Sequence, residues 1–132
     1  MLFRSKARAA YLRAIDLDPG HAEAHLNLGR LLHERGDLAG AESHYRQACA
    51  ARPDSALAAF NLGVALEDQG RGKEAMAVYA RALRLDPEHA EAHFNLGRLC
   101  EAAQLAEFII GTELPGRVYR ARSSLTGLKA TD

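Results

Sequence analysis

Histidines occur in two pairs with helical spacing. His21 and His25 are four residues apart, and His89 and His93 repeat that spacing. Two imidazoles on adjacent turns of a helix can bind zinc when further ligands converge on them. No cysteine accompanies either pair in the sequence, and two ligands rarely hold the ion alone. We therefore expect no metal site. His25 and His93 should occupy core positions, and His21 and His89 should follow a turn.

One asparagine recurs at a constant interval, because Asn27, Asn61 and Asn95 are each 34 residues apart. An asparagine amide offers both a donor and an acceptor, so it can pair with a peptide backbone whatever the sequence of that peptide. We predict that the three amides form a ligand-binding stripe. The alternative is that they only bond neighbouring helices, as polar groups near a core often do.

Arginines and apolar residues should share this surface. Arg30 and Arg98 each follow an asparagine by three residues and could anchor acidic side chains; alternatively, Arg30 forms an ion pair with Glu34 on its own helix. Glu67 is expected on the solvated side. The apolar candidates are Leu26, Phe60, Val64 and Phe94. No nucleophile motif, glycine-rich phosphate loop or pair of catalytic carboxylates is present, so we expect no catalysis and no cofactor.

A 34-residue repeat positions all of these side chains. Residues 21–31 read HAEAHLNLGRL and residues 89–99 read HAEAHFNLGRL, two periods later. Self-similarity at this period is typical of stacked helix–turn–helix units, each too small to bury its own apolar face. Other residues recur at the same interval: Pro19, Pro53 and Pro87; Gly29, Gly63 and Gly97; Tyr11, Tyr45 and Tyr79; and Ala14, Ala48 and Ala82.

Residues 22–55 contain one complete repeat. Small and apolar residues at spacings of three and four predict two helices, each with one buried face. Gly36 should separate the two helices, Asp37 can cap the second, and Pro53 should end it. Gly29 should allow the two helices to approach closely.

In these residues the chain closely resembles the tetratricopeptide repeat family, over roughly residues 7–103. The resemblance implies an all-α fold, a short right-handed solenoid of antiparallel helix pairs in which the first helices line a concave groove. It also implies a non-catalytic domain that binds peptides or partner proteins. The asparagines look like the ladder in the repeats of O-linked N-acetylglucosamine transferase.

A second subgroup of this family fits less well. Its chaperone-binding members use a carboxylate clamp, with lysine at the positions of Leu26 and Glu91 and arginine at that of Asn95. None of the three residues here is basic, so we expect the ligand not to be a heat-shock C-terminal peptide.

The chain departs from the repeat at both ends. The first helix of the first repeat is missing, and Gln104 replaces the glycine that twice separated the helices. Gly111, Pro115 and Gly116 should interrupt the last helix, leaving a short apolar helix, LAEFII. The predicted organisation is a solenoid over 1–103, with a half repeat at 4–21, full repeats at 22–55 and 56–89 and a fourth starting at 90, followed by a divergent cap helix or tail at 104–132.

Charge and cysteine content narrow the class of partner. Seventeen basic residues balance 17 acidic ones, which argues against nucleic acid. No apolar run is long enough to cross a membrane, and Cys49 and Cys100 are expected to be reduced.

We predict a cytoplasmic protein-interaction module that holds an extended peptide or a partner protein in its groove. The alternatives are a repeat segment of a larger protein, such as a glycosyltransferase, and a scaffold that self-associates through its incomplete terminal repeats.

Overall fold

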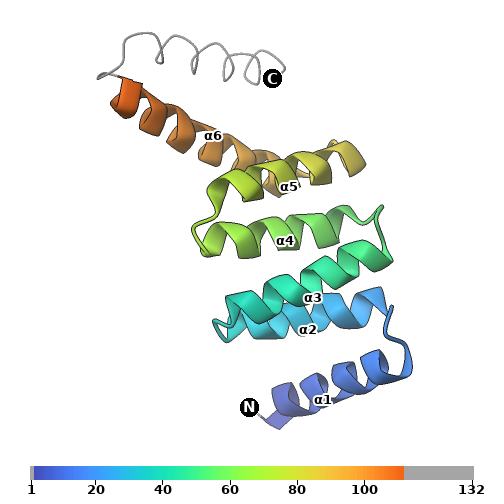
Figure 1. The fold of residues 1–132 in the computed structure, drawn as a ribbon. Helices are drawn as coiled ribbons and strands as arrows, with labels where there is room; N and C mark the ends of the chain where they lie inside the picture. Colours follow the sequence, from blue (N-terminus) through green and yellow to red (C-terminus); the bar gives the residue numbers. More distant parts are fainter. Residues whose placement is uncertain (1, 112–132) are drawn as a thin grey trace. The chain divides into compact units, whose positions relative to one another are not determined.

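The computed structural model describes residues 2–111, and in that range the secondary structure is entirely helical (Figure 1). The helices are α1 (Leu2–Leu17), α2 (Ala22–Glu34), α3 (Leu38–Ala51), α4 (Ala56–Asp68), α5 (Gly72–Leu85) and α6 (Ala90–Gly111). The prediction of an all-α fold is confirmed, and the helices are separated near Pro19, Gly36, Pro53, Gly70 and Pro87. The chain divides into two compact units, Met1–Ala92 and His93–Asp132.

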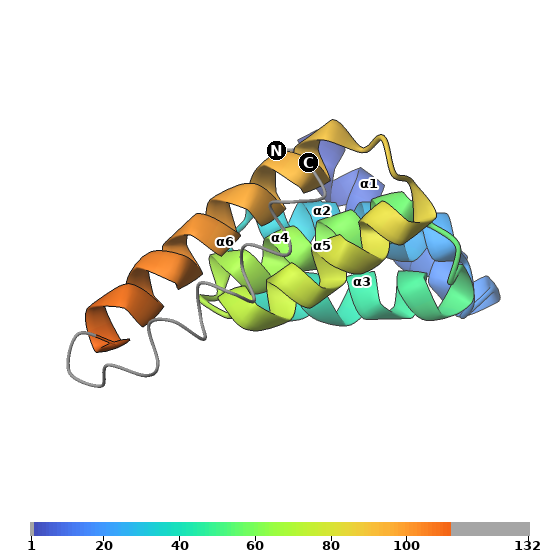
Figure 2. The same ribbon diagram turned by 90° about the horizontal axis from the view of Figure 1, so that it is seen from above.

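The first unit is a stack of helices in which each packs on the next along the chain. Helix α2 packs on α3 and α4 on α5, which makes two complete pairs. Helix α3 also contacts α4, and α1 contacts α2. Figure 1 shows α1 to α5 as successive layers, and Figure 2 looks down the stack. The apolar core therefore runs through the stack, as expected when no single pair can bury its own face.

Glycine ends the first helix of each complete pair. Gly36 has φ +83° and Gly70 has φ +78°, a left-handed conformation that a residue with a Cβ rarely adopts. Side chains cap the starts of α3 and α4. The carboxylate of Asp37 accepts from the backbone N–H of Gly40 (2.9 Å), and the hydroxyl of Ser55 accepts from that of Ala58 (3.1 Å).

Close helix packing explains the recurring glycine and tyrosine. A Cβ placed on Gly29 would lie 2.6 Å from Cε1 of Tyr45, and one on Gly63 would lie 2.5 Å from Cε1 of Tyr79. Both tyrosines are fully buried. Burial raises the pKa of Tyr45 to about 12. The glycine thus makes room for the ring of the paired helix and allows the close helix approach that the repeat predicted.

Helix α6 is longer than the equivalent helices α2 and α4. It runs for 22 residues to Gly111, through Gln104. Gln104 lies one period after Gly70, and its Cβ disfavours the left-handed turn that stops the earlier helices. The prediction of a separate short helix at LAEFII is therefore wrong, because these residues continue α6. Pro115, Gly116 and the rest of the predicted cap or tail lie outside the described residues.

Candidate functional site

Two of the three predicted asparagines lie in the first unit, on adjacent helices. Asn27 is in α2 and Asn61 is in α4, and both are half-buried. A hydrogen bond joins these two helices, because Nε2 of His33 lies 2.6 Å from Oδ2 of Asp68. The first helices of the two repeats are therefore neighbours, and the asparagines occupy equivalent positions on them.

The two amides differ in their bonding. The Asn27 Oδ1 accepts a hydrogen bond from Nη1 of Arg30 at 3.3 Å on the surface, which leaves both of its N–H donors for other partners. Among the described residues, the side chain of Asn61 makes no hydrogen bond, so its donors and its acceptor are all available. Asn95 is half-buried and Arg98 is exposed on α6, in the second unit. Whether the three amides form one stripe remains a prediction.

The predicted apolar contacts differ in exposure. Leu26 and Val64 are half-buried, and Phe94 is 70% exposed on α6. Phe60 is only 8% exposed, because its ring stacks on His89 with centroids 4.7 Å apart and also contacts Tyr79. Phe60 therefore offers little surface to a ligand.

A further apolar residue belongs with these candidates. Leu57 is 53% exposed on α4 and was absent from the predicted site. Its spacing of four residues from Asn61 places it on the same face of the helix, and that spacing was the available signal.

Two charged residues have other partners than expected. Glu34 forms an ion pair with Arg4 of α1 at 3.4 Å, rather than with Arg30 on its own helix. Glu67 is half-buried and accepts a hydrogen bond from the hydroxyl of Tyr79 at 2.9 Å. The expectation that Glu67 is simply solvated is wrong, because the tyrosine of the paired helix reaches it.

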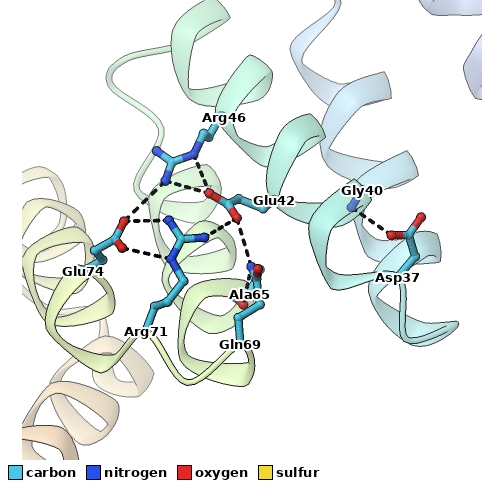
Figure 3. A network of polar contacts seen from close by, with 8 residues as sticks. All are labelled: Asp37, Gly40, Glu42, Arg46, Ala65, Gln69, Arg71 and Glu74. Atoms are coloured by element: carbon cyan, nitrogen blue, oxygen red, sulfur yellow. Dashed lines mark hydrogen bonds and ion pairs between the residues drawn. The ribbon is translucent and has the colours of Figure 1, made fainter.

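A polar network joins the second helices of the two repeats (Figure 3). Glu42 of α3 accepts from Nη1 of Arg71 at 2.6 Å, from Nε2 of Gln69 at 3.0 Å and from Arg46 at 2.8 Å. Arg71 also pairs with Glu74 at 2.8 Å. Burial would raise the pKa of the Glu42 carboxyl, but these hydrogen bonds outweigh it and hold the pKa below its usual value. The network members bind one another, so they brace the repeats and do not form a ligand site.

The histidine pairs serve as caps and core contacts. Nδ1 of His21 accepts from the N–H of Ala24 at 3.1 Å, and Nδ1 of His89 accepts from that of Ala92 at 3.2 Å. Within residues 2–111 no three histidine, cysteine or carboxylate side chains converge in a way that could hold a metal ion. Sequence reasoning placed these two histidines after a turn but missed that each caps a helix.

His25 is buried, as predicted, and pairs with a second histidine. Its Nε2 lies 2.8 Å from the carbonyl oxygen of Pro19, and its Nδ1 lies 3.0 Å from Nδ1 of His44. Because a carbonyl only accepts, Nε2 of His25 must be the donor, and a neutral His25 then accepts at Nδ1. Burial and the neighbouring His25 lower the pKa of His44. By contrast, His93 is exposed on α6, so its predicted core position is wrong.

Comparisons with known proteins agree with this geometry. A model of the tetratricopeptide repeat family matches residues 3–56, 39–88 and 60–107. No curated protein sequence matches the chain significantly. Within the described residues, no helix is both long enough and apolar enough to cross a membrane.

Two solved structures are similar to this chain. The first TPR domain of Spaghetti (RPAP3), bound to the HSP90 peptide SRMEEVD, has a TM-score of 0.72 at 26% identity, over 76% of this chain and 79% of that one. The TPR domain of Arabidopsis OM64 has a TM-score of 0.69 at 29% identity, over 73% of this chain and 79% of that one.

Proposed function

Because this chain belongs to the tetratricopeptide repeat family, we propose that it is a non-catalytic interaction module that holds an extended segment of a partner protein on its first helices. The observation that carries this proposal is the position of the Asn61 amide, which is half-buried, free of side-chain hydrogen bonds to described residues, and equivalent to Asn27 on the adjacent helix. An amide held in this way is suited to pair with a peptide group of a bound chain.

The ligand is recognised mainly through its backbone. Asn27 and Asn61 offer donors and acceptors at one residue per repeat, and Asn95 supplies the third at the same register in the sequence. Asparagines recurring in this way form the ladder type of tetratricopeptide site. Within the first unit, apolar side chains of the ligand pack on Leu26, Leu57 and Val64, and an acidic side chain pairs with Arg30.

The bound segment is internal to the partner and is not a chain terminus. The similar domain of Spaghetti is bound to an HSP90 peptide, but this chain lacks basic residues at the clamp positions. Leu26 is apolar, Glu91 is anionic and exposed, and Asn95 is neutral. A terminal carboxylate at these positions would meet a like charge in Glu91 and a basic residue at none of the three.

A peptide-display selection tests the proposal. Peptides recovered on the wild-type chain are measured by fluorescence polarisation against the triple variant Asn27→Ala/Asn61→Ala/Asn95→Ala. The matched control is Ser43→Ala/Gln47→Ala, which changes exposed polar residues on α3. Three hydrogen bonds worth about 0.5–1.5 kcal/mol each predict binding at least roughly tenfold weaker for the triple variant.

Two results would overturn the proposal. Unchanged affinity in a folded triple variant would remove the asparagines from the site, and a triple variant that unfolds would make them structural. A separate arm uses the peptide SRMEEVD with a free and with an amidated C-terminus. Tight binding that requires the free carboxylate would contradict recognition of an internal segment.

A further inference from the structure

A cavity between α1 and α2 is lined mainly by arginines. Its volume is about 370 Å³, which lies in the range of small-ligand sites. Helices α1 and α2 pack on each other within the first unit, so both walls belong to one compact body. The lining residues are Arg4, Ser5 and Arg8 of α1, Leu31 of α2, and Arg35, which caps the C-terminus of α2. None of them is acidic, so the cavity is suited to an anion.

The described residues do not balance the charge of this cavity. Arg4 forms an ion pair with Glu34 at 3.4 Å. The guanidinium groups of Arg8 and Arg35 have no hydrogen-bond or ion-pair partner among residues 2–111. Three arginines and one glutamate leave a net charge of +2. Each guanidinium carries several N–H donors and no acceptor, so the two unpaired groups offer donors to a ligand.

The next junction of the stack shows what an anion does at this position. Glu42 of α3 stands one 34-residue period after Arg8. Gln69, at the end of α4, stands one period after Arg35. The Glu42 carboxylate accepts from Nε2 of Gln69 at 3.0 Å and from Nη1 of Arg71 at 2.6 Å (Figure 3). Its side chain is only 14% exposed. One carboxylate thus joins α3 to the end of α4 and the turn that follows.

The junction of α1 and α2 has donors on both sides instead. Arg8 replaces the acceptor Glu42, and Arg35 replaces the neutral donor Gln69 by a charged one. Asp37 stands where the arginine of that network stands, but it caps α3 and pairs with neither arginine in the described part of the chain. An anion bound between Arg8 and Arg35 would therefore supply the acceptor that Glu42 supplies one repeat later.

This cavity continues the surface of α2 that carries the Asn27 amide. Leu31 follows Asn27 by four residues, and Arg35 follows Leu31 by four. Residues with this spacing are neighbours on a helix surface. A segment of a partner protein that pairs with Asn27 is thus close enough to place one of its side chains in the cavity.

We propose that the cavity binds a phosphorylated serine or threonine side chain of the partner, with its phosphate between Arg8 and Arg35. The choice of a protein partner rests on the function proposed above, whereas the choice of a phosphate rests on the cavity. A phosphorylated side chain carries a charge of about −1.5 to −2 at neutral pH, which matches the net charge of +2. Guanidinium groups pair with phosphate oxygens through parallel hydrogen bonds. The Ser5 hydroxyl donates a further one, and Leu31 packs on the carbon atoms of the bound residue.

The first test uses probes that need no partner protein. Inorganic phosphate and O-phosphoserine are titrated into the chain at fixed ionic strength, and the Nε–Hε signals of Arg8 and Arg35 are followed by NMR. Both signals should shift to saturation. Acetate should bind at least roughly tenfold more weakly, because it carries a smaller charge. Phosphate should also raise the melting temperature, since it binds the folded chain.

A charge-matched pair of variants shows whether the cavity is responsible. Arg8→Glu/Arg35→Gln introduces the residues of the next junction, so phosphate should no longer shift the melting temperature. Lys6→Glu/Arg13→Gln makes the same change in net charge at exposed positions of α1 that do not line the cavity. This control should bind phosphate within about threefold of the wild type, because salt screens exposed charges at a distance.

A second test identifies the source of the phosphate. A peptide selected on the wild-type chain is synthesised with serine or phosphoserine at each position in turn, and binding is measured by fluorescence polarisation. At one position phosphoserine should bind at least roughly tenfold more tightly than serine, and Arg8→Glu/Arg35→Gln should abolish this gain. The triple asparagine variant should weaken both forms and keep the gain, so failure of the asparagine site and failure of the phosphate site give different results.

Three results would refute the phosphate site. Phosphate could shift the signals of Arg8 and Arg35 no more than that of Arg13, or Arg8→Glu/Arg35→Gln could bind phosphate as tightly as the wild type. Free phosphate could also bind while phosphoserine gives no gain at any peptide position, which would make the ligand a small phosphorylated compound and not a partner protein.

Discussion

Helices α2 and α6 begin with almost the same eleven residues but have different surroundings. His25 and Gly29 of α2 are buried, whereas His93 and Gly97 of α6 are exposed. In α2 the covering residues come from α3, which supplies Ala41, Tyr45 and Ala48. The positions that hold Ala41, Tyr45 and Ala48 in α3 hold Ile109, Glu113 and Gly116 two periods later. The comparison teaches that a first helix does not determine its own burial, because its partner must supply the covering residues.

The ends of the same two helices also differ. Gly36 allows the left-handed turn after α2, and Gly70 does so after α4. At Gln104 the backbone stays helical to Gly111. The glycine at this position thus allows the chain to turn after the first helix of each complete pair.

The largest expected effect is a difference in unfolding free energy between the same glycine-to-leucine substitution made in α2 and in α6. Gly29→Leu would place side-chain atoms where the ring of Tyr45 lies. It should lower the free energy of unfolding by about 1–3 kcal/mol or more. Gly97→Leu in dilute solution should change it by no more than about 0.5 kcal/mol. Urea unfolding followed by circular dichroism measures both. Equal destabilisation by the two variants would contradict the difference in burial between α2 and α6.

The next effect concerns the stability of the left-handed turn that follows the first helix of a pair. Gly70→Gln introduces the residue found at 104 and forces a Cβ into a left-handed conformation, at a cost of about 1–2 kcal/mol. The reciprocal change, Gln104→Gly, should shorten α6, and backbone chemical shifts of residues 105–111 would report it. If Gln104→Gly leaves those shifts helical, the glycine is not what stops the helix.

A smaller effect depends on the network around Glu42. The folded state lowers the pKa of this carboxyl from its usual value near 4.5, so the unfolded state binds the proton more tightly. The stabilisation is complete above that usual value and is lost as the pH falls through the folded pKa. Glu42→Gln should lower the melting temperature at pH 7 and make its decline in acid shallower. Parallel curves for the two proteins would show that the network does not contribute.

The smallest effect should come from the pair formed by buried His25 and half-buried His44. The folded state lowers the pKa of His44 from its usual value of 6.5, so protonation favours the unfolded state and stability declines as the pH falls below 6.5. The double variant His25→Ala/His44→Val introduces the residues that stand at the equivalent positions of the next repeat. Its melting temperature should change less between pH 7 and pH 5 than that of the wild type. His93→Ala, at the equivalent exposed position, should leave the slope as in the wild type.

The sequence by itself determined the repeat and most of the helix boundaries. The recurrence of Gly29, Tyr45 and Pro53 every 34 residues predicted the helices and the turns. Such signals are local, because they act through backbone conformation and the spacing of apolar residues. The same periodicity predicted that Gly29 allows its two helices to approach closely, because equivalent residues occupy equivalent places in stacked units. The contact between Gly29 and the ring of Tyr45 came from the structure.

Only the tertiary structure decided how equivalent residues are used. Phe60 is enclosed by His89 and Tyr79, Glu67 is bound by a buried hydroxyl, and His93 is exposed where His25 is buried. The pattern of residues on the face of a single helix predicts none of these contacts and exposures. Burial and hydrogen bonding depend on side chains that a neighbouring helix brings from elsewhere in the sequence, and a repeat pattern does not encode whether that neighbour is present.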